Sequence, residues 1–475
     1  MTEVIKPDIC VIGGGSGGLT VAAAAAAFGV SVVLIEAGKM GGDCLNYGCV
    51  PSKAIIAAAK TANSMRHAEK FGSQNVEPEV NFRKVHDHVH SVIAAIAPND
   101  SVERFTALGV KVIEAHGKFK DAKTVVAGDY EIKARRFVVA TGSSAFVPPI
   151  AGLESVEYLT NETLFDETRK PNHLLVIGGG PIGMEMAQAH RRLGSKVTVI
   201  EGLKALGKDD PELAEVVLRN IRADGVEILE GANVVGVEQT TKTKVTVRIS
   251  TEEGERDVSG SHILVATGRA ANVNGLDLEK AGIKYDRKGI EVSNDLRTSN
   301  KRVYAIGDVS GGFQFTHVAG YHAGLVIQSI LFRIAGKENR DIIPWATYTD
   351  PELAHVGLDE DAARKRVGTI NILLWPYAEN DRAQAERKTE GLVKIVTDKK
   401  GKILGASIAG ANAGEMINVF ALAVSKKLKV QDLRGFIAPY PTMTEITKRA
   451  ATSFSAPLTR KPSVRRIINF LRIFG

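Results

Sequence analysis

This chain begins with a strand, a glycine-rich turn, a helix and a second strand that ends on an acidic residue. This unit constrains the fold more than any other feature. An apolar strand is predicted over residues 9–12 and an alanine-rich helix over 19–28, and a second strand over 31–35 ends on Glu36. In such a unit the helix N-terminus faces phosphates and the acid accepts a ribose hydroxyl. The pattern therefore predicts a dinucleotide-binding α/β fold. The glycines for the tight bend, the approach of a pyrophosphate and the packing of helix on strand are Gly13, Gly15 and Gly18.

The same pattern recurs further along the chain. A strand predicted over residues 174–177, a second glycine turn and a helix over 184–193 lead to a strand that ends on Glu201. An acid at this place favours an unphosphorylated ribose, hence NADH over NADPH, although Lys204 and Lys208 downstream would soften that preference. The glycines of this second turn are Gly178, Gly180 and Gly183.

Three further segments are predicted to reach a nucleotide. Thr141-Gly142 and Thr267-Gly268 both follow apolar runs, and they look like strand ends that return towards the glycine turns. Asp308 follows a buried strand predicted over residues 303–306. A carboxylate there suits a hydroxyl-rich ligand such as a ribityl chain.

Two cysteines lie between the dinucleotide motifs. Cys44 and Cys49 are close enough in sequence to close a small ring, and a helix that Pro51 helps to start would place its positive dipole end beside them. The third cysteine, Cys10, lies in an apolar strand-like run, so a structural disulfide framework is not indicated. Alone, the pair would be read as two ordinary buried thiols. Between dinucleotide motifs, it is interpreted as a redox pair.

Composition and charge restrict the class of protein. The 475 residues allow about three domains, and the longest apolar run, Val21 to Val30, is too short to cross a bilayer. Only a few polar residues precede the first strand, so no signal peptide is expected, and we expect a cytoplasmic protein in a reducing compartment. The net charge of +7 is concentrated in the C-terminal tail, so a general nucleic-acid surface is not indicated.

Taken in order, these motifs resemble the pyridine nucleotide-disulfide oxidoreductases, the flavoenzymes that include dihydrolipoamide dehydrogenase, glutathione reductase and mercuric reductase. Segments 349–357 and 441–445 also match, so the resemblance covers residues 5–452. It implies an α/β fold with two doubly wound, Rossmann-like dinucleotide-binding domains and a C-terminal α+β dimerisation domain. The implied parts are an FAD-binding domain (1–150 and 272–342), an NAD(P)-binding domain (151–271), a dimerisation domain (343–456) and a basic amphipathic tail (457–475).

The resemblance implies FAD in the first fold and NAD(H), rather than NADP(H), in the second. Cys49 would face the flavin as the charge-transfer thiolate, and Cys44 would attack a substrate disulfide as the interchange thiol. Lys53 matches the lysine near flavin N5, and Glu185 matches its carboxylate partner. The residues matched to FAD contacts are Gly13, Gly15, Gly18, Glu36, Gly42, Lys53, Gly117, Thr141, Gly142, Asp308, His317 and Ala319, and those matched to NAD contacts are Gly178, Gly180, Gly183, Glu201 and Gly268.

The chain departs from the family near its C-terminus. Similar glutathione and lipoamide reductases carry a histidine before the proline, which reaches the partner subunit's active site as acid and base, and a glutamate that orients it. Here Tyr440 precedes Pro441, while Glu445 is retained. A free phenol titrates near 10, against about 6.5 for an imidazole, so Tyr440 is a poor proton acceptor. Tyr440 is expected to donate a hydrogen bond, present a ring to a flat substrate, or fill space.

The cysteine segment also departs from its relatives. Asp43 and Tyr47 replace the threonine and small apolar residue usual around the pair, and Asp43 is expected to raise the pKa of the Cys44 thiol if the two are close. No cysteine follows Cys49, so neither the extra C-terminal cysteines of mercuric reductase nor a thioredoxin-reductase-like relay is present.

Three histidines invite a metal site. His86, His88 and His90 lie in one predicted helix, but its apolar stripe is expected to turn the histidines towards solvent or a partner. No metal site is therefore predicted.

The segment after Pro457 is predicted to be a basic amphipathic helix. Its apolar residues recur at helical spacing, and it carries five cations and no acid. Such a helix suits an anionic membrane, as a peripheral contact, or docking on the protein's own dimer. The cations are Arg460, Lys461, Arg465, Arg466 and Arg472.

The leading interpretation is an NADH-dependent, dihydrolipoamide dehydrogenase-like homodimer that reduces a small-molecule or protein disulfide, or a related oxidant, through FAD and Cys44–Cys49. A second interpretation is direct reduction of a quinone or other acceptor by the flavin, with the cysteines regulatory or vestigial. A third is a binding subunit tethered to a partner or membrane by its tail. Lys53, Glu185 and both cysteines argue against the third.

Overall fold

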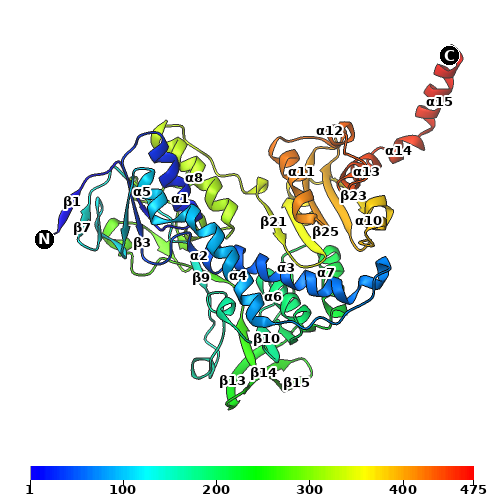
Figure 1. The fold of residues 1–475 in the computed structure, drawn as a ribbon. Helices are drawn as coiled ribbons and strands as arrows, with labels where there is room; N and C mark the ends of the chain where they lie inside the picture. Colours follow the sequence, from blue (N-terminus) through cyan, green and yellow to red (C-terminus); the bar gives the residue numbers. More distant parts are fainter. Residues whose placement is uncertain (1) are drawn as a thin grey trace. The chain divides into compact units, whose positions relative to one another are not determined.

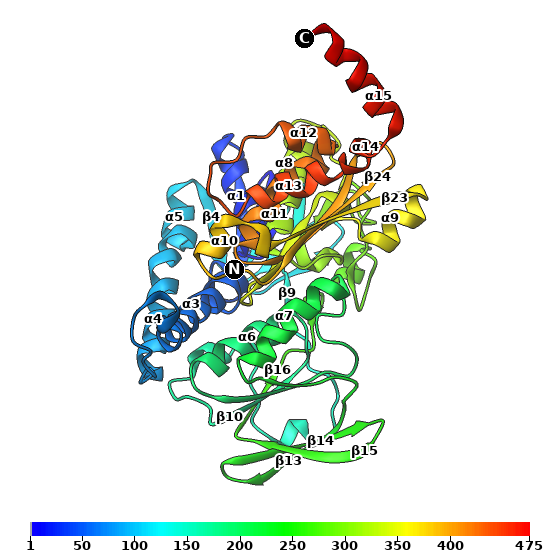
Figure 2. The same cartoon turned by 90° about the vertical axis from the view of Figure 1, so that its right-hand side faces the viewer.

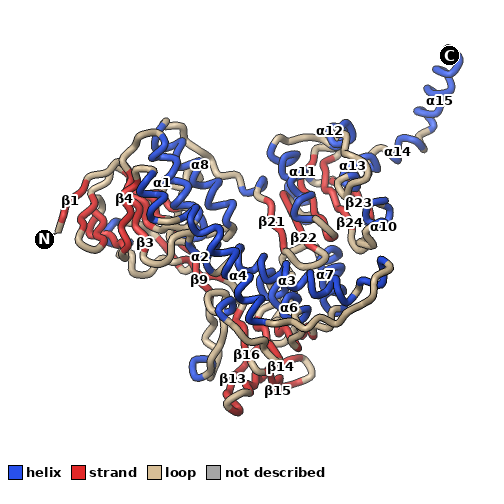
Figure 3. The backbone as a smooth tube through the Cα atoms, viewed as in Figure 1, coloured by secondary structure: helices blue, strands red, loops and turns tan. Residues whose placement is uncertain are grey.

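The computed structural model describes residues 2–475, which form two compact units. One unit contains the residues up to Leu203 together with 227–338, and the other contains 204–226 together with the residues from Asn339 onwards. Figures 1 and 2 show two views of the chain, and Figure 3 distinguishes helices from strands. None of the helices in the described range is both long and apolar enough to cross a membrane.

A parallel five-stranded sheet lies at the centre of the first unit. In order across the sheet its strands are β20 (Val303–Ala305), β8 (Arg136–Val139), β2 (Ile9–Ile12), β3 (Val32–Glu36) and β4 (Val110–Glu114). All of β2 is buried, and its alternate side chains enter different cores. Ile9 and Val11 pack with α1 (Ser16–Ala27) and α8 (Thr316–Leu331), which lie side by side in Figure 1.

The other face of this sheet is covered by a smaller sheet. Cys10 and Ile12 of β2 share a core with Phe119, Val125 and Ile132. The strands of the smaller sheet, in order, are β1 (Glu3–Ile5), β7 (Tyr130–Ile132), β6 (Thr124–Ala127) and β5 (Gly117–Asp121).

A second parallel sheet repeats the arrangement. Its strands, in order, are β12 (Glu227–Leu229), β11 (Lys196–Ile200), β10 (His173–Ile177) and β16 (His262–Val265). Helix α6 (Pro181–Arg192) packs against β10 and β11. An antiparallel sheet shares a core with β10 and β11 through Leu175, Ile177 and Ile200, and its strands are β13 (Asn233–Thr241), β14 (Lys244–Thr251) and β15 (Gly254–Gly260).

The cysteine segment lies in helices that follow strand β3 in the chain. Helix α3 (Cys49–Arg66) packs on α4 (Phe82–Ile96) and on α6, so it joins the two folds within the unit. The remaining elements of this unit are α2 (Gly42–Asn46), α5 (Val102–Ala107), β9 (Ser143–Ala145), β17 (Arg269–Ala271), β18 (Tyr285–Asp286) and β19 (Gly289–Ile290).

The second unit is built on an antiparallel five-stranded sheet. Its strands, in order, are β21 (Pro344–Thr347), β22 (Glu352–Gly357), β25 (Ile403–Gly410), β24 (Leu392–Asp398) and β23 (Ile370–Pro376). Its helices are α7 (Pro211–Ala223), α9 (Glu360–Val367), α10 (Asp381–Ala385), α11 (Ala413–Ser425), α12 (Val430–Gly435), α13 (Glu445–Ser453), α14 (Ala456–Thr459) and α15 (Pro462–Leu471). In both views α15 extends away from the sheet of its unit.

Helix α7 belongs with this second unit. It packs on β22 and β25, and Lys394 of β24 lies 2.7 Å from Asp210, which caps the helix. Residues 204–226, expected in the NAD(P)-binding domain, therefore group with the C-terminal sheet. The domain boundaries stay a prediction.

The predicted fold class is confirmed: two parallel α/β folds and an antiparallel C-terminal sheet with helices. The two helices predicted to start at residues 19 and 184 begin earlier, at Ser16 and Pro181. Glycine and proline are typical of turns, so the pattern predicted later helix starts. Proline is nevertheless favoured in the first turn of a helix, where Pro181 lies.

Candidate active site

The first glycine turn admits no side chain at its two tightest positions. Gly13 has φ of +113°, and a Cβ there would lie 2.3 Å from the carbonyl oxygen of Ala140. A Cβ on Gly18 would lie 1.9 Å from the carbonyl oxygen of Gly13. The second turn repeats this geometry at Gly178 (φ +111°) and Gly183.

The start of each helix is open towards solvent. Gly15 and Gly180 cap α1 and α6 without any side-chain hydrogen bond to the helix. A Cβ on Gly180 would meet no atom within 4 Å, and one on Gly15 would meet only the Cα of Gly42, at 3.9 Å. Both N-termini therefore present backbone N–H groups to a space that fits a pyrophosphate.

Each acid at the end of the second strand is held by its own turn. Glu36 accepts the N–H of Gly14, and Glu201 accepts the N–H of Gly179 at 2.7 Å. These bonds orient the carboxylates at the positions where the sequence predicts a ribose.

Asp308 lies in a polar cluster beside the first fold. Ser143 donates to its carboxylate at 2.6 Å, and the Nε of Arg269 lies 4.0 Å away. Burial raises the pKa of Asp308, and the bond from Ser143 and the charge of Arg269 oppose that rise. The Thr141 hydroxyl donates to the Asn272 carbonyl at 2.8 Å, which orders the turn at Thr141-Gly142.

The cysteine segment touches the first glycine turn. Gly42 has φ of +61°, and a Cβ there would lie 2.8 Å from the Cα of Gly15. Cys44 follows in α2, and Cys49 is the first residue of α3. As predicted, one cysteine therefore lies at the N-terminus of a helix.

The environment of Cys49 favours its thiolate. A hydrogen bond from the Cys44 thiol lowers the pKa of Cys49 to about 6, and the desolvation imposed by surrounding groups opposes this. The Thr316 hydroxyl, 3.3 Å away at the start of α8, and the charge of Lys53 lower the pKa further. The same contact with Cys49 raises the pKa of Cys44. The pair therefore holds one proton, on Cys44.

Asp43 acts differently from the prediction. Its carboxylate lies 3.1 Å from the guanidinium of Arg269 and accepts from Asn161 at 3.0 Å. The rise in the pKa of Cys44 comes first from Cys49 and then from burial, whereas the charge of Asp43 raises the pKa of Cys49. Asp43 is therefore not among the main causes of the raised pKa of Cys44, and its effect is found on Cys49.

Lys53 and Glu185 form an ion pair. Lys53 Nζ lies 2.9 Å from the Glu185 carboxylate, and Glu185 is nearly buried in α6. The pair thus links the cysteine helix to the second dinucleotide fold.

The comparisons with known proteins agree with this geometry. The model of the pyridine nucleotide-disulphide oxidoreductases matches residues 7–323, and that of their dimerisation domain matches residues 343–451. The chain belongs to this family. It is therefore an FAD-dependent pyridine nucleotide-disulphide oxidoreductase, and its cofactors are FAD and a pyridine nucleotide.

Similar proteins include a mercuric reductase of Lysinibacillus sphaericus, 35% identical over 453 residues that cover 94% of this chain and 82% of that protein. A dihydrolipoyl dehydrogenase of Thermus scotoductus is 34% identical over 458 residues, covering 94% of this chain and 96% of that protein. Among solved structures, the HOCl-induced flavoprotein disulfide reductase RclA from Escherichia coli has a TM-score of 0.83 at 27% identity, covering 94% and 99% of the two chains.

Other residues matched to the oxidoreductase family lie near the first fold. His317 follows Thr316 in α8, and its ring stacks on Phe315 with centroids 5.3 Å apart. Ala319, one turn on, is the nearest neighbour of any Cβ added at Gly17, at 3.1 Å. Gly117 starts β5 and packs against the side chains of Ile35 and Ile12 rather than facing open space.

The three histidines of α4 are not all turned to solvent. His88 is exposed, but His86 and His90 are half-buried with rings 4.2 Å apart. His90 Nε2 lies 3.1 Å from the Phe165 carbonyl. The loop around Phe165, distant in sequence, therefore contacts this helix at His90, and whether the histidines face a partner stays a prediction. Across residues 2–475, no three His, Cys, Asp or Glu side chains are grouped so as to hold a metal ion.

Tyr440 lies in the second unit with an unforeseen partner. The residue is 70% exposed, and its phenol donates to the Asp381 carboxylate at 3.1 Å. That bond raises the pKa of Tyr440 above its usual value. Glu445 begins α13 and lies 4.0 Å from Arg449. The sequence carried no signal for Asp381, which is far from Tyr440 along the chain.

Proposed function

We propose that this oxidoreductase passes electrons from NADH, by way of FAD at the first glycine turn, to Cys44–Cys49 and on to a disulfide. It would act as a homodimer in a reducing cytosol, as its dimerisation domain and its cysteine content favour. The observation that carries the proposal is the placement of Cys49 at the N-terminus of α3, bonded to Cys44 and 3.3 Å from the Thr316 hydroxyl. These contacts lower the pKa of Cys49 to about 6 and so favour its thiolate at neutral pH.

Bound FAD would accept a hydride from the nicotinamide and supply two electrons to the cysteine pair. Those two electrons, together with the proton of the same hydride equivalent, would open a Cys44–Cys49 disulfide to the Cys49 thiolate and the Cys44 thiol. When the shared proton moves to Cys49, the Cys44 thiolate attacks the acceptor disulfide and expels one thiolate, which takes up a proton. Cys49 then attacks the mixed disulfide, releases the second thiol and restores the pair. The charge of Lys53 lowers the pKa of Cys49 and so favours the Cys49 thiolate.

The cysteine inventory favours a disulfide over a metal ion as acceptor. Some relatives are named mercuric reductases. Here the only cysteine outside the pair is Cys10, which is fully buried in β2 and whose pKa burial raises. The chain therefore lacks a second thiol pair that could deliver a soft metal ion to Cys44.

The second candidate is direct reduction of a quinone or other acceptor at the flavin. Tyr440 favours it, because a phenol that donates to Asp381 is a poor base for thiol chemistry but can present a ring. A pure binding subunit is disfavoured by the ion pair of Lys53 and Glu185.

Thiol counting tests the leading proposal. Anaerobic addition of one equivalent of NADH to the oxidised, FAD-loaded protein should expose two new alkylatable thiols per chain, found by mass spectrometry on Cys44 and Cys49. Because Cys49 is deprotonated above its pKa, its alkylation rate in the reduced protein should rise with pH and reach half its plateau near pH 6. Full flavin reduction without new thiols would contradict the proposal.

We expect NADH to be preferred over NADPH. Glu201, held by the Gly179 N–H, would repel a 2′-phosphate. Glu201→Arg should therefore narrow or invert the ratio of kcat/KM for the two nucleotides, by roughly tenfold or more. Glu253→Arg, on the exposed turn after β14, adds the same charge elsewhere and should leave the ratio unchanged. A wild-type preference for NADPH would refute this assignment of Glu201.

The tail is proposed to make a peripheral contact with an anionic membrane. It lies beyond both family matches, and α15 leaves Ile467, Ile468 and Leu471 more than half exposed among its arginines. Truncation after Pro457 should preserve FAD content and dimerisation but weaken binding to anionic vesicles, and salt should weaken the full-length protein's binding. Equal vesicle sedimentation with and without the tail would refute the membrane contact and favour docking of the tail on the dimer.

A further inference from the structure

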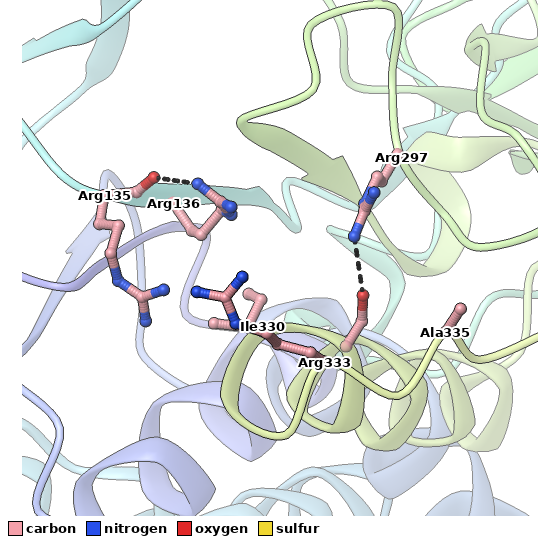
Figure 4. A pocket seen from close by; sticks show the side chains of 7 residues that line it. Arg135, Arg136, Arg297, Ile330, Arg333 and Ala335 are labelled. Atoms are coloured by element: carbon pink, nitrogen blue, oxygen red, sulfur yellow. Dashed lines mark hydrogen bonds between the residues drawn. The ribbon is translucent and has the colours of Figure 1, made fainter.

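A pocket of about 130 Å³ in the first unit is lined by arginines (Figure 4). The arginines come from three separate places: the approach to β8, the loop before β20 and the end of α8. Its lining residues are Arg135, Arg136, Arg297, Ser329, Ile330, Arg333 and Ala335.

The pocket lies at the amino ends of the parallel strands, whereas the dinucleotide turns lie at their carboxyl ends. Arg136 is the first residue of β8 and pairs in register with Ile9, the first residue of β2. Parallel α/β sheets bind nucleotides beyond the carboxyl ends of their strands, where Gly13 and Asp308 lie. The cofactors therefore do not account for these arginines.

The positive charge in the pocket is only partly neutralised by the protein. Arg135 lies 3.3 Å from Asp8, and Arg297 lies 3.5 Å from Asp295. Arg136 donates to no acid, only to the Arg135 carbonyl at 2.9 Å. Burial lowers the pKa of Arg136, and the charges of Arg135, Arg297 and the nearby Arg302 lower it further.

Arg333 adds a fourth charge without a protein partner. Its side chain makes no hydrogen bond or ion pair with any residue in the range 2–475. It follows α8 with φ of +57°, a left-handed position usually taken by glycine or asparagine. A cation there is favoured by the helix dipole. One cation is enough for that effect, however, and the dipole does not explain why three other arginines converge on the same cavity.

Part of the pocket is rigid. Arg297 donates to the hydroxyl of Tyr304 at 2.9 Å and to that of Ser329 at 3.3 Å. Tyr304 is fully buried and also bonds to Ser329 at 2.9 Å. This triad fixes one guanidinium before any ligand arrives.

We propose that this arginine pocket binds a phosphate group. Planar guanidinium forks match phosphate oxygens in pairs, and a doubly charged oxyanion would offset the charges of Arg136 and Arg333. The volume is well below the roughly 300–1,000 Å³ of sites for drug-sized ligands, so the pocket suits a phosphate rather than a whole nucleotide. Inorganic phosphate, pyrophosphate and a small phosphomonoester share this chemistry.

Calorimetry on the full-length, FAD-loaded protein tests the proposal. NAD⁺ is kept saturating to fill the second glycine turn, and ionic strength is held constant with KCl. Phosphate, pyrophosphate and glycerol 3-phosphate are titrated separately. Saturable binding of at least one phosphate compound is expected. The strongest binder shows whether the pocket takes a free anion or the phosphate of a larger molecule, and binding no tighter than that of chloride overturns the proposal.

Two variants assign the binding to the pocket. Arg136→Gln and Arg333→Asn should each weaken it by roughly tenfold or more, because each removes a charge-assisted contact. Asparagine is tolerated at left-handed φ, so Arg333→Asn should fold even if Arg136→Gln does not. Arg256→Gln, on the exposed face of β15, removes the same charge elsewhere and should change nothing. Equal affinity in Arg333→Asn and wild type would overturn the assignment.

Discussion

Replacing Cys44 with serine is expected to lower NADH-dependent disulfide reduction by at least about a thousandfold. The reason is chemical: electrons leave the pair only when a thiolate forms a mixed disulfide with the acceptor, and a serine hydroxyl cannot form that bond. Quinone reduction by the same variant should stay within a few-fold of wild type, because it needs no sulfur. Steady-state NADH oxidation with each acceptor measures both activities.

Cys10→Ala is the matched control for this experiment. It removes the third thiol, buried in β2 and away from the pair, so both activities should survive if the protein folds. FAD content and circular dichroism check folding in each variant. Disulfide reduction that persists in Cys44→Ser would refute the proposed route. A wild-type protein that reduces quinones but no disulfide would establish the second candidate function.

The variant also separates Cys44 from Cys49. A hydrogen bond from the Cys44 thiol is the main cause of the low pKa of Cys49. The hydroxyl of Cys44→Ser can still donate that bond, whereas Cys44→Ala cannot. Thr316 and Lys53 remain, and both also lower that pKa. The midpoint for alkylation of Cys49 is therefore expected above pH 6 in Cys44→Ala and closer to that of the reduced wild type in Cys44→Ser.

The dinucleotide turns were predictable because their constraints are local. Gly13 has a positive φ, and a Cβ on either Gly13 or Gly18 would lie less than 2.5 Å from a backbone carbonyl oxygen. The two carbonyl groups belong to the same strand–turn–helix unit or to the end of the returning strand. The pairing of Lys53 with Glu185 followed from two motifs that the family resemblance joined.

Contacts between motifs were not predictable in the same way. The effect of Asp43 on Cys44 was predicted from their adjacency in sequence, but the Asp43 carboxylate is bound by Arg269, the first residue of β17. Thr316, which lowers the pKa of Cys49, lies on a helix far along the chain. The arginine pocket gives no sequence signal either, since Arg136, Arg297 and Arg333 belong to segments that only the sheet brings together.

Restoring histidine at position 440 is expected to raise turnover of a common disulfide, such as lipoamide or glutathione disulfide, by roughly tenfold to a hundredfold. The phenol of Tyr440 donates to Asp381, which holds it protonated, so it is a poor acceptor for a thiol proton. An imidazole accepts that proton near neutral pH. The half-reaction with NADH should be unchanged, because it does not use this residue.

The structure shows which acid would assist the new imidazole. A carboxylate beside a histidine stabilises the charged form and raises its pKa, so Asp381 should move the pH optimum of Tyr440→His upwards. Adding Asp381→Asn should return that optimum towards the ordinary histidine value of about 6.5. If Glu445 orients the imidazole instead, Asp381→Asn will leave the profile in place and Glu445→Gln will shift it.

Tyr440→Phe is the control for the phenol itself, because it keeps the ring and removes only the hydroxyl that reaches Asp381. If Tyr440 fills space, wild type and Tyr440→Phe should turn over every acceptor equally. If the native substrate requires the hydroxyl, Tyr440→Phe and Tyr440→His will both lose that activity while still binding FAD. Fast wild-type turnover of lipoamide or glutathione disulfide would refute the argument from the outset, since it would show that the reaction needs no base at position 440.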